Sequence, residues 1–539
     1  MKDENQKYLW WQEGVIYQIY PRSYQDSDGD GVGDLQGIIQ RLDHIKSLGM
    51  TAIWISPIFS SPMADFGYDI SDYCGIHPLF GTMEDFDELL QAVHDRGMKL
   101  ILDLVPNHTS NEHPWFKESR SSKDNPKRDW YIWENANEDG SEPNNWLSVF
   151  GGSAWEWDEK TQQYYYHAFL KEQPDLNWRN PEVQEAMMDV MRFWLDKGVD
   201  GFRVDVMWHM IKDDQLRDNP TNPNYKSHQA TYEKLIPAYS TDQPEVHDIV
   251  HMMRKVLDSY DERMMIGEIY LPIHKLMTYY GTDKNGAHLP FNFLLLSTDW
   301  DAGEIASNIN QYEAALPEGG WPNWVLGNHD QSRISSRVGQ DQARVAAMLL
   351  LTLRGTPTIY YGDEIGMRDV PIPEEEVQDP QGLNMPGLNL SRDPQRTPMQ
   401  WDDSENAGFS SSKPWLPLPA NHRRVNVKAQ ADDHDSMLAL HQRLLNLRQK
   451  EDALRIGHYK PMEAQKPLLA YMRYTSDTRF LILLNLSHKT CHFHPEHFQF
   501  EGSIEIDTLP EREGTEVKDR VSLSGDEGMV IRLKHRKDQ

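Results

Sequence analysis

The chain has 539 residues, 38% of them hydrophobic, which excludes a single small domain and disfavours a disordered protein. Acidic residues outnumber basic ones by 84 to 54, and the net charge of −30 disfavours binding to nucleic acid or to anionic membranes. We interpret this acidity as a solvated surface, with adaptation to a saline habitat as the alternative.

The two cysteines, Cys74 and Cys491, cannot build a disulfide framework or a thiolate metal cluster, and they fit a reducing compartment. The first residues, MKDENQKYLWWQEG, lack the basic and apolar stretches of an export signal. No apolar run approaches the ~20 residues needed to cross a bilayer. We therefore expect a cytoplasmic monomer or homodimer with no membrane partner.

Short β-type segments alternate with amphipathic helical segments over residues 15–450. The predicted strands are 15–20, 52–55, 99–104, 201–205, 264–268, 287–291, 324–327 and 358–361. The predicted helices are 35–48, 82–96, 181–197, 246–259, 274–280, 301–314, 341–353 and 436–450. Repeated strand–helix units of this kind predict an α/β fold, a parallel (β/α)8 barrel of the TIM type.

Two connections are too long for simple turns, and long ordered loops of such barrels usually carry function. Residues 105–175, after the third strand, predict a small inserted domain, and residues 362–430, after the eighth, predict a lid. The barrel then comprises residues 1–104 and 176–454. From residue 455 to 539 β-type runs replace the helices and predict a C-terminal antiparallel β-sandwich domain.

Titratable side chains gather where four predicted strands end, which is the edge at which TIM barrels carry their active sites. They are Asp103 and His108 after the third strand, Arg203 and Asp205 in the fourth, Glu268 in the fifth, and His329 and Asp330 after the seventh. A single carboxylate there is usually a helix cap or a loop hydrogen-bonding group. Four strands that end in this way together indicate a site.

Carboxyl groups on the neighbouring fourth and fifth strands should stand ~5 Å apart, as in retaining glycoside hydrolases. Arg203 lies two residues before Asp205 on the same strand face and should keep it ionised, which suits a nucleophile. Glu268 has no cationic neighbour in the sequence, so its pKa can rise to suit a general acid/base. Asp330 is left to hold sugar hydroxyls and to favour an oxocarbenium-like transition state.

The segment DSDGDGVGD has the ligand spacing of the first part of an EF-hand loop. Asp26, Asp28, Asp30 and Asp34 would supply carboxylates and Val32 a carbonyl oxygen. The segment lacks the final glutamate and leads directly into a helix, so it predicts a structural Ca²⁺ or Mg²⁺ site. An acidic turn without an ion is the alternative. No organic cofactor is expected.

Five ordered segments resemble the α-amylase family, glycoside hydrolase family 13: DLVPNHTS (103–110), QPDLNW (173–178), GFRVDVMWH (201–209), MIGEIY (265–270) and VLGNHDQSR (325–333). The segments VIYQIYPRSYQDSDGDGVGDLQGI, SPMADFGYDISDY and RTPMQW (396–401) resemble its α-glucosidase and oligo-1,6-glucosidase branch. The resemblance covers most of the chain up to about residue 450.

The resemblance implies Asp205 as nucleophile, Glu268 as acid/base and Asp330 as third carboxylate. Around the terminal glucose it places Asp65, Tyr68, His108, Arg203, His329 and Arg396, with Phe150 and Phe169 as aromatic walls. Asp65 and Arg396 are expected to pair and to close the pocket behind that glucose, which implies exo action. The acidic segment 26–34 resembles the calcium or magnesium site of the branch. For each aromatic residue taken singly, core packing is the alternative.

Val206 follows the expected nucleophile. Valine at this position resembles the members of the branch that prefer α-1,6 linkages, whereas alanine or threonine would resemble those that prefer α-1,4 linkages. The next residues, MWH, differ from the usual INF-like continuation, so the linkage preference stays open, and packing at a strand end is the alternative role of Val206. The segment FNFLLLSTDW contains no RLDRD-like motif of the sucrose-isomerising relatives, which disfavours isomerisation.

We therefore expect an exo-acting retaining α-glucosidase that acts on maltose, isomaltose, related oligosaccharides or sucrose-like α-glucosides. An α-glucosyltransferase with the same covalent intermediate is the alternative enzyme. A non-catalytic relative of the transporter-associated proteins and a sugar-binding module are disfavoured, because all three carboxylates are present.

Overall fold

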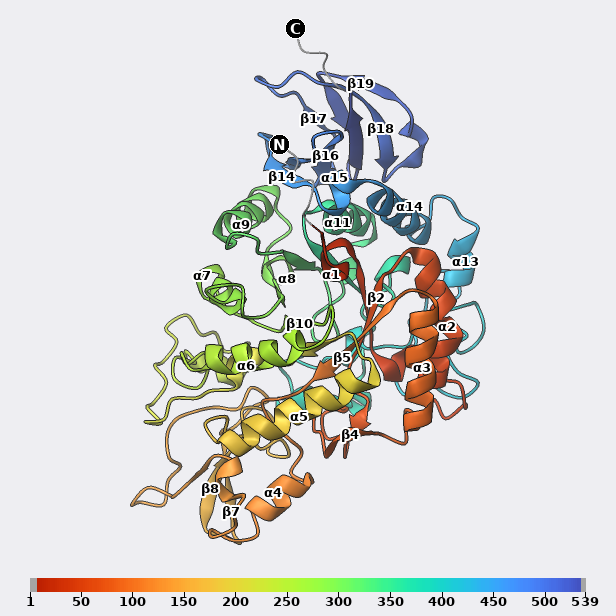
Figure 1. Ribbon diagram of the computed structural model, residues 1–539. Coiled ribbons are helices and arrows are strands. Elements are labelled where there is room, and N and C mark those ends of the chain that lie inside the picture. The colour runs from red at the N-terminus through yellow and green to blue at the C-terminus, as the bar shows by residue number, and fades with distance from the viewer. Residues whose placement is uncertain (1–6, 535–539) are drawn as a thin grey trace.

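Eight short parallel strands form the centre of the computed structural model, which describes residues 7–534 (Figure 1). They are β1 (Ile16–Ile19), β2 (Ala52–Ile55), β5 (Lys99–Leu104), β9 (Gly201–Val204), β10 (Met264–Gly267), β11 (Leu289–Pro290), β12 (Asn323–Val325) and β13 (Thr356–Tyr360). Their order is β11-β10-β9-β5-β2-β1-β13-β12, and a parallel bridge between Asn292 and Trp324 nearly closes the ring. The predicted (β/α)8 barrel is confirmed. Residues 1–6, the beginning of the segment interpreted as lacking an export signal, lie outside the described residues.

The barrel strands are mostly apolar on both faces because both faces are covered. Side chains of β1, β2, β9 and β10 are buried at every position. Strands of this kind read as continuous hydrophobic runs without alternation. The runs AIWI and MMIG in the sequence thus already indicated central parallel strands.

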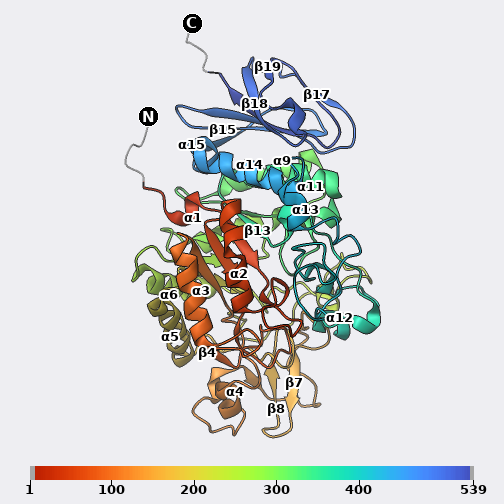
Figure 2. The same cartoon turned by 90° about the vertical axis from the view of Figure 1, so that its right-hand side faces the viewer.

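Helices follow the strands and surround them (Figures 1 and 2). The longer ones are α2 (Leu35–Leu48), α3 (Met83–Asp95), α5 (Pro181–Lys197), α6 (Val246–Asp258), α9 (Ala302–Ala315), α11 (Gln340–Thr352) and α14 (Met437–Lys450). Each lies within one residue of its predicted bounds. The predicted helix 274–280 is instead a short α-helix, α7 (Ile273–Leu276), followed by a 3-10 turn at Met277–Tyr280.

Local signals in the sequence set these helix ends. The Thr82 hydroxyl accepts from the Asp85 N–H at 3.2 Å, and the Asp85 carboxylate accepts from the Thr82 N–H at 2.7 Å, which completes a capping box. Gly198 ends α5 with a φ of 108°, a left-handed conformation that favours glycine. Other short helices are α1 (Trp10–Glu13), α8 (Leu294–Ser297), α10 (Ile334–Arg337), α13 (Val427–Ala431) and α15 (Asp452–Arg455).

Two excursions from the barrel lie over its mouth. Between β5 and α5 the chain forms α4 (Pro114–Ser119) and a three-stranded antiparallel sheet of β6 (Trp133–Glu134), β7 (Trp155–Asp158) and β8 (Gln163–Tyr166). After β13 a long segment contains the short α12 (Pro380–Asn384) and the 3-10 turns Asp363–Ile365, Glu374–Glu376 and Asp393–Gln395 before α13. A hairpin of β3 (Phe59–Ser60) and β4 (Asp72–Ile76) follows β2.

An antiparallel domain forms the C-terminal part and confirms that part of the predicted fold class. Its six-stranded sheet has the order β14 (His458–Pro461), β15 (Leu468–Tyr474), β16 (Arg479–Asn485), β21 (Gly528–Leu533), β18 (Glu501–Asp507), β19 (Glu516–Lys518). A second sheet pairs β17 (Cys491–Phe493) with β20 (Val521–Leu523), and side chains of both sheets share one core. The C-terminal strands and the β7–β8 hairpin lie at opposite ends of the molecule (Figures 1 and 2). Over residues 7–534, none of the helices is both long and apolar enough to traverse a membrane.

Candidate active site

A cavity of about 770 Å³ opens at the carboxyl ends of the barrel strands. Asp205 follows β9 directly, Glu268 follows β10 directly, and Asp330 lies in the loop after β12. The residues from the sequence prediction that line the cavity are Asp65, Tyr68, His108, Phe150, Phe169, Asp205, Val206, Glu268, His329 and Asp330. Arg203 and Arg396 are fully buried behind this lining and bond to it. The structure thus brings the predicted catalytic and substrate-binding residues to one place.

One guanidinium joins the two carboxyl groups expected to react. Arg203 Nη1 donates to Asp205 Oδ1 at 2.6 Å and to Asp103 Oδ1 at 3.0 Å, and Arg203 Nη2 lies 2.8 Å from Glu268 Oε2. Arg203 pairs with Ile266 across β9 and β10, so its side chain reaches both strand ends. Glu268 thus has no cationic neighbour in the sequence but has one in space, because Arg203 is distant along the chain and adjacent in the fold.

Burial sets the protonation of the reacting pair. It raises the pKa of both Asp205 and Glu268, and Arg203 opposes that rise at each. Glu268 raises the pKa of Asp205 further. Two buried carboxyls beside one cation favour a state with a single shared proton, since ionising both would place like charges together.

Asp330 differs from this pair. Burial alone would raise its pKa, but His329, Arg392 and Arg396 together hold that pKa well below its usual range. Arg396 Nη2 donates to Asp330 Oδ1 at 2.8 Å and Arg392 Nη1 does so at 3.2 Å. Asp330 is therefore an anion throughout the physiological pH range.

Val206 holds an unusual backbone conformation at the site. Its φ is 36° and its ψ 47°, in the left-handed region that a β-branched residue rarely occupies. This conformation directs the Val206 N–H to Glu268 Oε2 at 2.9 Å. The main chain next to Asp205 therefore positions the carboxylate of Glu268, while the Val206 side chain lines the cavity.

The closed end of the cavity is formed by Asp65, Arg392 and Asp330. Asp65 Oδ1 lies 2.8 Å from Arg392 Nη2, whereas Arg396 donates to Asp330 Oδ1 and to the His329 carbonyl at 2.8 Å each. The predicted pair of Asp65 with Arg396 is thus corrected to Asp65 with Arg392. The two arginines flank the 3-10 turn Asp393–Gln395, and both reach Asp330. Their spacing in the sequence could not tell which of them also meets Asp65.

Arg392 was missed by the sequence reasoning, although SRDPQR offers a second arginine four residues before Arg396. Gln173 was named only within the segment QPDLNW; its Nε2 donates to Asp65 Oδ2 at 3.2 Å. Gln18, in the middle of β1, donates to His329 Nδ1 at 2.8 Å. A polar residue within an apolar strand was the available signal for Gln18, because buried amides require partners.

Neutral imidazoles and a phenol complete the polar wall. Tyr68 Oη lies 2.7 Å from His329 Nε2, the two rings stack at 5.4 Å, and the phenol donates to Asp103 Oδ2 at 3.0 Å. Burial lowers the pKa of His329 well below its usual value and lowers that of His108 to about 4. Both histidines are therefore uncharged at neutral pH and offer hydrogen bonds without adding charge.

Two aromatic rings from the inserted segment line the same cavity. Phe150 and Phe169 meet edge to face with centroids 5.5 Å apart. The Arg392 guanidinium lies 4.7 Å above the Phe150 ring, and Phe169 lies 5.3 Å from the His108 ring. Both residues predicted as aromatic walls therefore lie in the cavity lining.

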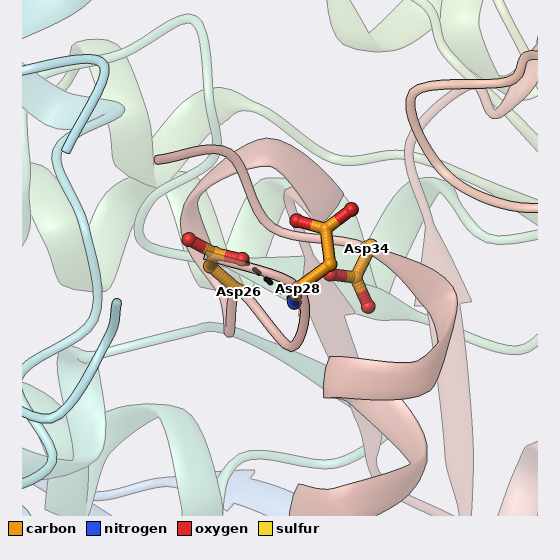
Figure 3. Close-up of side chains that lie close together, drawn as sticks. All are labelled: Asp26, Asp28 and Asp34. Atoms are coloured by element: carbon orange, nitrogen blue, oxygen red, sulfur yellow. Dashed lines mark hydrogen bonds between the residues drawn. The ribbon is translucent and has the colours of Figure 1, made fainter. Parts of the chain in front are cut away.

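The acidic loop, residues 26–34, brings three of its four predicted carboxylates together (Figure 3). One oxygen each of Asp26, Asp28 and Asp34 lies within 4.8 Å of the others. Asp30 is outside this group, and its Oδ1 accepts from the Val32 N–H at 2.8 Å. Three carboxylates are a donor set that suits Ca²⁺ or Mg²⁺.

The acidic loop is also held by its own backbone. Burial would raise the pKa of Asp26, but the Ser410 hydroxyl and the N–H groups of Gly29, Gly31 and Asp28 hold it below its usual value. Asp34 caps α2 by accepting from the Gly37 N–H at 2.7 Å. The loop thus has both a cation-compatible donor set and internal hydrogen bonds that order it.

Residues 18–457 match the family model described as the α-amylase catalytic domain. The oligo-1,6-glucosidase of Parageobacillus thermoglucosidasius is 41% identical over 533 residues, covering 92% of this chain and 93% of that protein. A probable α-glucosidase of Rhizobium meliloti is 42% identical over 493 residues, covering 89% of each. The crystal structure of the α-glucosyl transfer enzyme XgtA is 42% identical, with a TM-score of 0.93 over 98% of this chain and 100% of that one. The chain belongs to the α-amylase family, glycoside hydrolase family 13.

Proposed function

We propose that this protein is an exo-acting retaining α-glucosidase that removes terminal glucose from short α-glucosides. The observation that carries the proposal is the guanidinium of Arg203, which contacts Asp205 at 2.6 Å and Glu268 at 2.8 Å. Two carboxyls held in one site, one ionised and one protonated, are what double displacement at a sugar C1 requires. The oligo-1,6-glucosidase and α-glucosidase relatives support this substrate class.

Asp205 is the nucleophile in this mechanism and Glu268 the general acid. An Asp205 oxygen attacks C1 as Glu268 transfers its proton to the departing glycosidic oxygen, which gives a glucosyl ester of Asp205. Glu268 then takes a proton from water while that water attacks C1. The Asp205 carboxylate leaves, and α-glucose is released.

The other charged groups stabilise this path. Arg203, with the shorter contact to Asp205, favours the ionised nucleophile. The permanently ionised Asp330 favours positive charge that develops on the sugar ring. Neutral His108 and His329 with Tyr68 would bind glucose hydroxyls.

Exo action is supported by the closed end of the cavity. Asp65 and Arg392 form an ion pair at 2.8 Å, and Arg392 also pairs with Asp379 at 2.6 Å. This network would block the binding of further sugar units behind the terminal glucose. Arg392 is the only lysine or arginine among the described residues that line the cavity, which favours a neutral substrate over a phosphorylated one.

Transfer to a sugar or another alcohol is the second candidate function. The structural neighbour XgtA, a glucosyl transfer enzyme, is 42% identical and matches 98% of this chain. Its name supports a route in which an acceptor hydroxyl replaces water at the glucosyl ester. Product analysis at high maltose concentration separates the two: glucose dominates for a hydrolase, and trisaccharides dominate for a transferase.

A structural cation completes the proposal. Asp26, Asp28 and Asp34 would hold a Ca²⁺ or Mg²⁺, which supplies loop stability and no chemistry in the cavity. We also propose a cytoplasmic location, supported by the two unpaired cysteines, Cys74 and Cys491, and a monomeric or homodimeric state.

The decisive experiment is proton NMR of early hydrolysis of maltose, isomaltose and sucrose, with a polymeric α-glucan for comparison. We expect α-glucose as the first anomer, rapid turnover of at least one short substrate and little action on the polymer. Release of β-glucose first, or preference for internal bonds of the polymer, would overturn the proposal.

A further inference from the structure

Trp415 lies between the acidic loop and the closed end of the cavity, in the long segment that joins β13 to α13. It does not line the cavity and is half-buried. Its contacts nevertheless run to the elements that carry Asp65 and Arg396. Two of these contacts are made by the indole and one by the main chain of Trp415, and the two indole contacts can be tested separately by substitution.

The first contact reaches the neighbour of Asp65. The guanidinium of Arg22 lies 4.7 Å from the Trp415 ring and 5.0 Å from the Phe66 ring. The Trp415 and Phe66 rings also meet directly, with centroids 5.4 Å apart. Phe66 directly follows Asp65 and has a φ of 49°, so the loop that presents Asp65 is strained and needs support from packing.

The second contact reaches Arg396. Trp415 Nε1 donates to the Ser23 hydroxyl at 2.9 Å, and that hydroxyl donates to the Arg396 carbonyl oxygen. The Arg396 guanidinium lies 5.2 Å above the Tyr20 ring, whose centroid is 6.4 Å from that of Trp415. Backbone and side chain of Arg396 are thus both held by groups that touch Trp415.

The third contact reaches the acidic loop. The Trp415 N–H donates to the Gly31 carbonyl at 3.0 Å. A few residues earlier in the same segment, the Ser410 hydroxyl donates to Asp26 Oδ2 at 2.5 Å. The segment 409–415 therefore spans from the acidic loop to the closed end.

We propose that Trp415 is a positioning residue for the glucose subsite: it holds Asp65 through Phe66 and Arg396 through Ser23, and anchors both to the acidic loop. This inference rests on the proposed α-glucosidase function. Asp65 and Arg396 both lie in loops, outside the barrel strands, so their separation depends on what lies between the loops. Misplacement of such groups by about 1 Å can cost 10²-fold in efficiency. Trp415 contacts Phe66 beside Asp65 and Ser23 beneath Arg396, and so supports both loops from outside the cavity.

The test compares Trp415→Phe, Ser23→Ala and Trp415→Ala with a matched control, Trp300→Phe. Trp415→Phe keeps an aromatic ring beside Arg22 and Phe66 but loses the hydrogen bond to Ser23. Trp300 is also half-buried and donates through Nε1, to Gln342 at 2.6 Å, but does not line the cavity. Each protein is measured for glucose affinity by calorimetry, for kcat and KM on maltose, and for thermal stability.

We expect Trp415→Ala to weaken glucose binding and to raise KM by about tenfold or more, with a smaller change in kcat. Trp415→Phe and Ser23→Ala should each have an effect of about threefold. The double variant should lose no more than Ser23→Ala alone, because Ser23→Ala already removes the hydrogen bond from Trp415 together with the one to the Arg396 carbonyl. Trp300→Phe should bind glucose as the wild type does.

A lower melting temperature with unchanged glucose affinity and KM in Trp415→Phe and Ser23→Ala would show a merely structural role and overturn the proposal. The same two variants decide the matter if Trp415→Ala does not fold. Failure of the proposed function is a distinct result, since a wild-type protein that hydrolyses no α-glucoside can still be tested for glucose binding.

Discussion

The backbone N–H of Val206 donates to Glu268 Oε2 at 2.9 Å, so the residue after one reacting carboxylate positions the other. The bond depends on the left-handed backbone of Val206 and not on its side chain. Chemistry and selectivity are therefore separable at this position. The main chain holds the acid/base while the isopropyl group shapes the cavity wall.

Replacing Val206 by threonine should change linkage preference while leaving the chemical step intact. We expect the ratio of kcat/KM for isomaltose to that for maltose to fall by about tenfold, since a few contacts in a pocket are worth 1–3 kcal/mol. Hydrolysis of α-glucosyl fluoride, which has no second sugar, is the control and should stay within about twofold. An equal loss on all three substrates would instead indicate that Asp205, the nucleophile that all three require, has been displaced.

Asp205→Asn and Glu268→Gln should separate the two chemical roles. Asp205→Asn removes the nucleophile, so kcat should fall by at least about 10³-fold on every substrate. Glu268→Gln removes the general acid, so kcat on maltose should fall by about 10²–10⁴-fold. The rate of glucosyl-ester formation from α-glucosyl fluoride should fall much less, because the fluoride leaving group needs no proton. Rapid-quench measurement of the first turnover checks this. Identical losses of the two variants on both substrates would contradict the assignment.

A double-mutant cycle should verify that Asp65 pairs with Arg392. Each single change, Asp65→Ala and Arg392→Ala, should lower kcat/KM for maltose by about 10²-fold, and the double variant should lose little more, because either change breaks the same ion pair. The comparison is the double variant of Asp65→Ala with Arg396→Ala, in which the losses of kcat/KM from the two single changes should be closer to additive. Stronger coupling of Asp65 to Arg396 than to Arg392 would restore the pairing first expected from the sequence.

Calcium should stabilise the protein through three aspartates of the acidic loop. We expect Ca²⁺ to raise the melting temperature of the wild type and of Asp30→Asn, but not that of Asp28→Asn. The two variants are matched, because each aspartate is exposed and accepts one backbone N–H two residues ahead. Calorimetric titration of the chelator-treated proteins measures binding directly. Equal loss of calcium binding in both variants would return Asp30 to the ligand set.

Asp507 in β18 should make stability depend on pH. Burial and the nearby Glu527 raise its pKa to about 8 in the folded chain, against about 4 in an unfolded one. Between these values the folded chain keeps a proton that the unfolded chain releases, so the stability from this group is present below pH 4 and lost as the pH rises toward 8. Asp507→Asn cannot ionise, and its gain in melting temperature over the wild type should grow from pH 5 to pH 9.

Glu511→Gln, an exposed change in the same domain, is the control for surface charge. The difference in melting temperature between Glu511→Gln and the wild type should stay nearly constant from pH 5 to pH 9. A gain for Asp507→Asn that is no larger at pH 9 than at pH 5 would mean that Asp507 ionises without cost in the folded chain.

The strands, the helices and most of the site residues were predictable because their signals are local. Buried parallel strands read as apolar runs, and helix ends such as Thr82 and Gly198 carry their own capping chemistry. Since parallel barrel strands present their carboxyl ends at one rim, Asp205 and Glu268 could be placed together without coordinates.

Only the tertiary structure decided which charges meet within that rim. Arg203 reaches Glu268 because of the register between β9 and β10. Arg392, and not Arg396, pairs with Asp65 because of the conformation of the loop around the 3-10 turn Asp393–Gln395. The left-handed conformation of Val206 has no signature in its residue type. Hydrogen bonds and ion pairs between side chains from separate segments depend on distances that must be right to within a few tenths of an ångström, and residue spacing along the chain does not contain that information.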